Sequence, residues 1–449
     1  MAMDITVKDM VDALKAKAIR QEMLWRYYDG DHPLLFSNKK LEKIHRGAKY
    51  VMNWSAIVID SLMDRLEITG YTAKSKALGN RLNDIWDTLR LAGEAEMVHE
   101  AVSVVGEAFV ICDNRDTAFF NDPRHVVAFY DPENPHKMVR AFKVWQEFDE
   151  RWYGAEYTPD YITLYEGSKG GDVPEDFRQF KRTTNPTRPE MPVFHFRISR
   201  RKLIGGAEKV ISIQNAVNKQ FSDMMVSSEF SAFKQRYAIG DFDVAEIEFS
   251  PDTMVRFPAG DPGAQDTSVG EFEAGTLSEY INSIESLVQG ISSITRTPKH
   301  YFHKQGGDPS GEALHAQEAP LIRKVRRYIK ALEPTWSELG GYLAGVTSAD
   351  VIPMYGDPRT IQALSQAQTR RENVGAGLPL LTQLRDEGWR EEELDQLLDD
   401  RLTERKTEKD ATQDREAILE DIADDINEHI ETAIEAIAQA ALQKMVGGS

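Results

Sequence analysis

The chain has 449 residues, 41% hydrophobic and 28% charged, a composition typical of folded globular proteins that excludes wholesale disorder. Its formal net charge of −19 argues against a protein that grips nucleic acid tightly, because such binding needs Lys and Arg to neutralise phosphates. The same charge is compatible with a protein that lets a polyanion slide past an electronegative wall.

The chain contains one cysteine, Cys112, which lies in the apolar run 108–112. It cannot form an intrachain disulfide, which favours a reducing compartment. The first residues lack the basic and apolar stretches of a secretion signal, and no stretch is apolar for long enough to span a bilayer. We therefore expect a soluble, cytosolic protein with no membrane partner.

The first 70 residues predict helices. Residues 6–9, Thr-Val-Lys-Asp, read as a helix start, and this helix is expected to stop at Gly30, where glycine can adopt the left-handed cap conformation. A second helix is expected after Asn53. Its predicted inner face comprises Trp54, Ile57, Val58, Ser61, Leu62 and Leu66.

Between residues 106 and 198 the pattern changes to short runs rich in β-branched and aromatic residues, separated by turn signals. We predict strands at 109–112, 118–120, 126–130, 139–145, 161–165 and 193–198. Their short spacing indicates an antiparallel meander packed on helices.

Two amphipathic helices are predicted on either side of residues 237–275. The first carries apolar residues at helical spacing and should end near residue 233; they are Val210, Ile213, Val217, Phe221 and Met224. The second begins at Thr276-Leu-Ser-Glu279, which we interpret as a capping box. Its stripe repeats every seven residues at Leu277, Ile284 and Ile291, interleaved with Tyr280, Leu287 and Ile294. So narrow a stripe predicts a seam with another helix, of the same chain or of another copy.

A third, longer helix is predicted from Asp308-Pro309, a capping aspartate followed by proline at the first helical position. Pro320 and Pro334 are expected to kink it. Its apolar stripe consists of Leu314, Leu321, Val325, Tyr328, Leu332, Trp336, Leu339 and Leu343.

Two segments read as accessory regions. The insertion 237–275 carries strand-like pieces at 244–249 and 254–257 and then a loop, and we expect a small protruding subdomain. After residue 358 the chain is predicted to be helical to its end. Residues 391–431 hold 17 acidic against 5 basic residues, which indicates a solvated helical region without a second core.

Glu96/His99 and Glu312/His315 are Glu-x-x-His pairs, with the spacing that aims both ligands inward in di-iron carboxylate bundles. About one such pair is expected by chance, and no further carboxylates are singled out. The sequence contains no phosphate-binding loop of the G-x-x-x-x-G-K-[ST] type, so if the protein belongs to a motor, the ATPase is another chain. A di-metal carboxylate enzyme thus stays an alternative hypothesis.

A small cationic loop follows the second seam helix and comprises Arg296, Lys299, His300, His303 and Lys304. It is either a loop that contacts a polyanion or an ordinary solvated loop. The run 323–330 is more densely basic, and its charges are expected to pair with the acidic surface of a neighbouring subunit.

Several segments, in this order, resemble the portal (head-to-tail connector) proteins of long-tailed bacteriophages. They are Tyr27-Tyr-Asp-Gly-Asp-His-Pro-Leu34, 53–66, 215–225, 230–237, Thr297-Pro298 and Pro309-Ser-Gly-Glu-Ala-Leu314. Each is unspecific alone, but the ordered set covers most of the chain. The resemblance implies a non-enzymatic virion protein, without catalytic residues, cofactor or resident metal, made in the host cytoplasm and placed at one capsid vertex.

The resemblance also implies an α+β, predominantly α fold. Its expected parts are a wing of N-terminal helices and a β meander (1–204), a first stem helix (205–236), a small α/β clip (237–275), a second stem helix (276–295), a tunnel loop (296–308), a long wing helix and connection (309–370) and an acidic helical crown (371–449). The stem seam would comprise Leu277, Ile284, Ile291, Val210, Val217 and Phe221. The clip would present Asp241, Asp243, Glu246 and Asp261, and the tunnel loop the cations named above.

The implied assembly is a homo-oligomeric ring, usually of twelve subunits, whose channel passes double-stranded DNA non-specifically during packaging and ejection. The implied partners are the terminase large subunit, a head-tail adaptor, and the major capsid and scaffolding proteins. A different minor structural protein of the virion is the other alternative.

Overall fold

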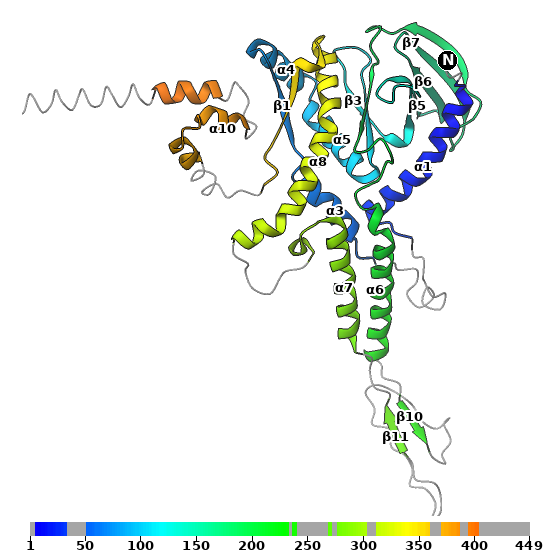
Figure 1. Ribbon diagram of the computed structural model, residues 1–449. Helices are drawn as coiled ribbons and strands as arrows, with labels where there is room; N and C mark the ends of the chain where they lie inside the picture. The colour runs from blue at the N-terminus through cyan, green and yellow to red at the C-terminus, as the bar shows by residue number, and fades with distance from the viewer. Residues whose placement is uncertain are drawn as a thin grey trace, which may run out of the picture. The chain divides into compact units, whose positions relative to one another are not determined.

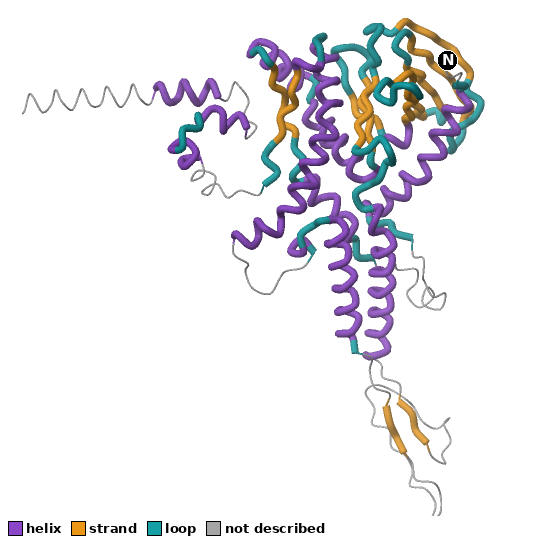
Figure 2. Tube along the Cα trace, viewed as in Figure 1, coloured by secondary structure: helices purple, strands orange, loops and turns teal. Residues whose placement is uncertain are grey.

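The computed structural model describes residues 5–33, 51–232, 236–239, 268–271, 276–302, 311–359, 370–386 and 394–403. The chain divides into two compact units, Met1–Thr369 and Arg370–Ser449. The first unit combines long helices with antiparallel sheets (Figures 1 and 2). The α+β prediction is confirmed at this level.

Helix α1 (Val7–Asp29) is bounded as its sequence predicts. The Thr6 hydroxyl accepts a hydrogen bond from the Asp9 amide while the Asp9 carboxylate accepts one from the Thr6 amide, which completes a capping box. The helix ends at Gly30, whose φ of 83° is the left-handed conformation that glycine adopts without strain.

The larger sheet is an antiparallel meander in the order β4-β5-β6-β7-β8. Its strands are β4 (Val126–Tyr130), β5 (Met138–Gln146), β6 (Arg151–Tyr157), β7 (Tyr161–Lys169) and β8 (Arg178–Thr184). Alternate residues of each strand face opposite sides, so Phe142 packs against Met10 and Leu14 of α1 whereas Ala141 lies in a separate cluster with Phe109. The predicted meander is therefore confirmed for the strands at 126–130, 139–145 and 161–165, with a helix on one face, whereas the predicted strands at 109–112, 118–120 and 193–198 form a second sheet on the other face.

The second sheet has three strands in the order β3-β2-β9. They are β2 (Glu107–Ile111), β3 (Phe119–Asn121) and β9 (Val193–Arg197). Its far face packs on α5 (Leu91–Val105) and α8 (Gly311–Ala344), with Phe196 against Trp336 at a ring distance of 4.7 Å. Cys112 follows β2 and is buried, which raises the pKa of its thiol.

Buried Glu107 ties α1 to this second sheet. Its carboxylate accepts hydrogen bonds from Lys17 Nζ at 2.8 Å, Gln21 Nε2 at 2.6 Å and His195 Nε2 at 2.7 Å, while the other His195 nitrogen bonds the Tyr130 hydroxyl at 2.9 Å. Burial alone would raise the pKa of Glu107, but the charge of Lys17 and the bonds to His195 and Lys17 lower it to about 2. The Glu107 carboxylate is thus ionised, and its hydrogen bonds join α1, β2 and β9.

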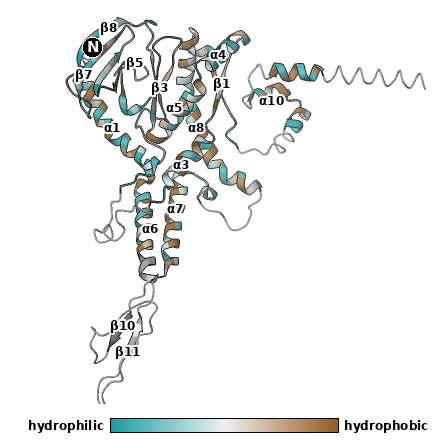
Figure 3. Cartoon of the chain, turned by 180° about the vertical axis from the view of Figure 1, so that it is seen from behind, coloured by the Kyte–Doolittle hydropathy of each residue, from teal (hydrophilic) through white to brown (hydrophobic). Residues whose placement is uncertain are grey.

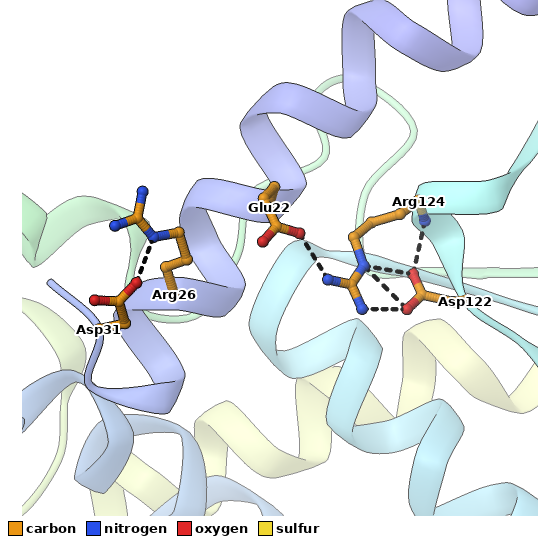
Figure 4. A network of polar contacts seen from close by, with 5 residues as sticks. All are labelled: Glu22, Arg26, Asp31, Asp122 and Arg124. Carbon is orange, nitrogen blue, oxygen red and sulfur yellow. Dashed lines mark hydrogen bonds and ion pairs between the residues drawn. The ribbon is translucent and has the colours of Figure 1, made fainter. Parts of the chain in front are cut away.

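A surface network of ion pairs holds the C-terminal half of α1. Arg124, in the short 3-10 helix η1 (Pro123–His125), donates to Glu22 of α1 at 2.7 Å and forks onto Asp122 (Figure 4). Arg26 pairs with Asp31 just beyond the helix end, at 2.9 Å. These contacts fix the orientation of the C-terminal half of α1.

Two further helices and a two-stranded sheet of the first unit lie around α8. They are α3 (Trp54–Met63), α4 (Lys76–Thr88), β1 (Ile68–Ala73) and β12 (Val351–Tyr355). Strand β1 pairs antiparallel with β12, from which it is separated by more than half of the chain. The predicted inner face of α3 is confirmed at Val58, Ser61 and Leu62, which are buried, whereas Leu66 is buried beyond the helix end.

Helix α8 buries its predicted stripe from Leu321 to Leu343. Leu314 is half-buried, and Pro320 and Pro334 lie inside the helix. The predicted start at Asp308-Pro309 lies outside the described residues. The helix thus supplies one wall of the main core along most of its length.

The insertion and the C-terminal unit are described in part. Strands β10 (Arg236–Ile239) and β11 (Ser268–Glu271) pair antiparallel. The predicted strands at 244–249 and 254–257, and the acidic residues Asp241, Asp243, Glu246 and Asp261, lie outside the described residues. In the second unit 370–375, α10 (Leu380–Asp386) and 394–403 are helical, as predicted, and 404–449 lies outside the described part.

Candidate functional site

Two antiparallel helices, α6 (Ile211–Ala232) and α7 (Leu277–Thr295), run side by side, directed away from the two sheets (Figures 1 and 3). The start of α6 meets the end of α7, since Ile213 lies next to Gly290. Both helices carry hydrophobic as well as hydrophilic residues along their length (Figure 3). The two predicted helices are confirmed; α7 lies within one residue of its predicted bounds and α6 ends near residue 233 as expected, but α6 begins at Ile211 and not at residue 205.

The seam between α6 and α7 is apolar and continuous with the interior of the first unit. Val210, Val217, Ile284 and Ile291 are buried in one cluster that also contains residues of α1, α3 and α5. Phe221 is half-buried and packs on this cluster. Leu277 is half-buried near the far end.

Two details of the predicted second helix are wrong. Ile294 is 48% exposed, and Val288 is buried instead, because the buried stripe of α7 follows three- and four-residue steps. The Thr276 hydroxyl makes no capping hydrogen bond; the Glu279 amide donates to the Thr276 carbonyl at 3.3 Å, so the predicted capping box is absent.

A close backbone contact fixes the chain just before α6. The Gly206 amide donates to the Ser103 carbonyl at 2.7 Å. A Cβ on Gly205 would lie 1.9 Å from the Val104 carbonyl oxygen, a distance that no side chain can occupy. Only glycine permits this approach, and it presses the segment leading into α6 against the end of α5.

Buried polar side chains on α6 form the root of the helix pair. Gln214 accepts hydrogen bonds from the Trp54 and Ser55 amides, at 3.0 and 3.1 Å, and so satisfies the first turn of α3. Asn218 accepts from the Met52 amide at 3.1 Å and donates to His32 Nδ1 at 2.8 Å. Sequence reasoning missed both residues, although they lie on the same helical face as the predicted seam.

The same network reaches the segment after α1. His32 is fully buried, stacks on Tyr27 and bonds the Tyr27 carbonyl through Nε2 at 2.9 Å. The Tyr27 hydroxyl donates to Asn215 of α6 at 2.7 Å. Burial lowers the pKa of His32, which keeps the ring neutral, so Nε2 donates while Nδ1 accepts from Asn218. Three segments far apart in sequence, near residues 27–32, 52–55 and 214–218, therefore converge at this point.

A buried ion pair connects the end of α7 with α3 and α8. Arg65 Nη2 lies 3.0 Å from Glu318 Oε1, and both side chains are about nine-tenths buried. His300, in the 3-10 helix η4 (Lys299–Tyr301), approaches Glu318 at 3.7 Å, and the Arg65 guanidinium lies over the Tyr301 ring. The segment after α7 is thus anchored to the first unit at its beginning.

The predicted cationic loop is described as far as residue 302. Arg296 closes α7 in the left-handed conformation and is exposed, as is Lys299. His300 is half-buried against Tyr301, with ring centroids 4.8 Å apart. His303 and Lys304 lie outside the described residues. Contact of this loop with a polyanion stays a prediction.

The structure does not support the di-metal hypothesis in the part of the chain it describes. His99 of α5 is buried against Trp336, whereas Glu96 of the same pair and His315 of the other are exposed. Among the described residues no group of three or more His, Cys, Asp or Glu side chains could hold a metal ion.

The sequence comparison decides the family. The model of the family described as "Phage portal protein, SPP1 Gp6-like" matches residues 8–340. The chain belongs to this family of phage portal proteins. The matched range contains α6, α7, the polar network at their root and nearly all of α8. The portal resemblance seen in the sequence is thereby confirmed.

Other comparisons add less to the portal assignment. No match was found among the curated proteins. A solved structure described as the virion of a native gene transfer agent particle is 11% identical with a TM-score of 0.44, covering 81% of this chain and 99% of that one. A second, the neck of an empty gene transfer agent particle computed with C6 symmetry, is 12% identical with a TM-score of 0.44, covering 72% and 89%. At these TM-scores the likenesses support no further conclusion.

None of the helices within the described ranges is long and apolar enough to cross a bilayer.

Proposed function

We propose that this portal protein is one subunit of a closed ring at a capsid vertex, with a central channel through which double-stranded DNA passes during packaging and ejection. The observation that carries the proposal is the α6–α7 pair, which is rooted by Gln214, Asn218 and His32 in segments of the matched family range. A helix pair held so firmly at one end is suited to repeat around an axis as the wall of a channel.

The proposed parts follow the resemblance. Residues 1–204 would form the wing, 205–236 and 276–295 the two stem helices, 237–275 the clip, 296–308 the tunnel loop, 309–370 the long wing helix and its connection, and 371–449 the crown. The buried seam of Val210, Val217, Ile284 and Ile291 supports the stem assignment, because it makes the two helices one rigid unit.

The proposed role of the channel is mechanical. The stem and tunnel loop would constrict around the duplex, while a terminase motor docked on the clip supplies the work. The net charge of −19 supports non-specific passage, since a negative wall disfavours tight phosphate binding. Lys299, exposed after α7, is the described tunnel-loop cation proposed to contact DNA.

The proposed partners are those of a head-to-tail connector. The terminase large subunit and a head-tail adaptor would bind the clip, where Asp241, Asp243, Glu246 and Asp261 are the proposed contacts. The major capsid and scaffolding proteins would surround the wing. Within the virion the protein would occupy a single vertex.

Sedimentation velocity of the purified full chain tests the ring. We expect a discrete species of about twelve times the 50.8 kDa mass of one chain, stable across a concentration series. Open-ended growth with concentration, or a monomer throughout, would contradict a closed ring.

A further inference from the structure

An acidic pocket lies between the end of α3 and the first turns of α5. Its volume is about 500 Å³, and its lining includes Asp64, Glu67, Glu96 and His99. Within the described part of the chain none of the three carboxylates has an ion-pair partner. We call these four residues the acidic pocket.

His99 gives the acidic pocket a buried hydrogen-bond acceptor. Its side chain is 3% exposed and is held edge-on by Trp336 at a ring distance of 5.9 Å. One ring nitrogen bonds the Leu66 backbone, and Nε2 has no hydrogen-bond partner among the residues that the structure describes. Burial lowers the pKa of His99 to about 4, so the ring is neutral at pH 7. Since a backbone carbonyl only accepts, the proton sits on the other nitrogen and Nε2 is a free acceptor.

The chemistry of the acidic pocket therefore fits an organic cation. A guanidinium or ammonium group would neutralise the carboxylates and donate to His99 Nε2. A bare metal ion fits poorly, because among the described residues no three such side chains converge at metal-binding distances.

A buried lysine of the same chain lies among further cations. Lys324 Nζ, on α8, is buried without a hydrogen-bond partner in the described structure. Lys209 of η2 (Glu208–Val210), Arg296 at the end of α7, and Arg327 of α8 lie near it. Burial and these three charges lower the pKa of Lys324 to about 8. We call these four residues the cation cluster.

Like charges gathered in this way oppose one another, and a buried ammonium without a partner loses its hydration. Both penalties are relieved when anions bind. The acidic pocket has the opposite need, because among the described residues its carboxylates have no cation and His99 Nε2 has no donor.

We propose that the acidic pocket of one copy of this chain receives the cation cluster of a second copy. The two surfaces are different, so the contact is head-to-tail, and an open row of copies keeps one free acidic pocket at one end and one free cation cluster at the other until a ring closes. This inference rests on the proposed ring. Neither surface is complete without the neighbouring copy.

Charge reversal at exposed members of each surface tests the pairing. One variant carries Asp64→Lys with Glu96→Lys, and the other carries Arg296→Glu with Arg327→Glu; all four side chains are exposed. Folding is checked for each by its thermal unfolding transition. A control carries Asp84→Lys with Arg201→Glu, exposed residues outside both surfaces.

We expect the wild type and the control to form rings and each reversed variant alone to stay dispersed. Mixing the two reversed variants restores complementary charge at every contact, so rings should return with the two chains alternating. Electron microscopy shows whether rings form, and native mass spectrometry shows whether they contain both chains.

Three results overturn the pairing while leaving the ring intact as a proposal. Rings from either reversed variant alone would assign the acidic pocket to another cationic partner. Reversed variants that are folded and dispersed but give no rings on mixing would show that the two surfaces do not bind each other. Rings lost equally in the control would attribute the effect to charge in general. A wild type that never forms rings contradicts the proposed function instead.

Discussion

Arg65 of the segment after α3 and Glu318 of α8 form an ion pair of 3.0 Å, with side chains 10% and 8% exposed. The pair joins helices that are separated by about 250 residues in the sequence. His300 contacts Glu318 and Tyr301 contacts Arg65, so the ion pair also fixes the position of the chain just after α7. A buried pair of this kind is costly to break, because the remaining charge stays desolvated.

Replacing Glu318 by Gln should lower the free energy of unfolding by about 3 kcal/mol, since the carboxylate that faces Arg65 is lost while Arg65 remains buried. Urea unfolding of the full chain measures this. Asp350→Asn is the matched control, because the Lys74–Asp350 pair is 69% and 39% exposed and should contribute less than about 1 kcal/mol. Equal losses in the two variants would contradict the anchoring role of Glu318.

Replacing Ile284 and Ile291 by Asp should destabilise the helix pair by several kcal/mol and prevent ring assembly, because both side chains are buried in the α6–α7 seam. Thermal unfolding and sedimentation velocity read out the two effects. Ile281→Asp is the control on the same helix: its side chain is 48% exposed, and stability should change by less than about 0.5 kcal/mol. Intact rings from the Ile284→Asp, Ile291→Asp variant would refute the seam.

Replacing Gln214 by Leu should cost about 2 to 3 kcal/mol. The Ser55 amide at the start of α3 loses its acceptor, and a buried amide without one pays its desolvation penalty, whereas the Trp54 amide also donates to the Met52 carbonyl at 3.2 Å. Hydrogen exchange should speed up at the Ser55 amide in particular. Gln289→Leu, at an exposed position of α7, should leave both stability and exchange unchanged. Unchanged protection of Ser55 in the Gln214 variant would contradict the capping role.

Acid should weaken the fold through His99. Its pKa is about 4 when folded, against about 6.5 for an unperturbed histidine, so the unfolded chain binds the extra proton first. The stability that neutral His99 contributes is complete above pH 6.5 and is lost as pH falls towards 4, by about 3 kcal/mol. His99→Gln should remove this part of the acid sensitivity, whereas His315→Gln, at an exposed site, should retain it. Identical pH profiles for wild type and His99→Gln would contradict the assignment.

The long helices could be predicted because their burial follows a local period. The stripe from Leu321 to Leu343 recurs at helical spacing, and α8 buries it as expected. The same helical spacing predicts which face of α7 is buried, although the predicted stripe wrongly includes Ile294. Thr276 failed as a capping residue because a Thr-x-x-Glu pattern permits a side-chain bond without requiring it.

Strands without a one-sided apolar pattern escaped prediction. Strand β8 is exposed along its whole length and lies at the edge of its sheet, so its sequence carries no buried alternation. Strand β6 contains Gly154 among mostly buried residues, which breaks the usual signal. Strands β1 and β12 pair across a separation that no local pattern encodes, and β12 contains Pro353, which argues against a strand.

The candidate site was predictable in its apolar half only. The seam residues follow from helical spacing, but the polar root depends on three distant segments meeting. Gln214 and Asn218 share a face with Val210 and Val217, and this placement of amides on an apolar stripe was the available signal. Their partners, His32 and the Ser55 amide, are determined by tertiary structure.

Negative-stain electron microscopy of the purified full chain, with class averages viewed down the particle axis, tests the central claim most directly. A channel-forming portal predicts closed rings with a central hole, all with one subunit number. Compact particles without a hole, in preparations where the chain is folded and assembled, would contradict the channel.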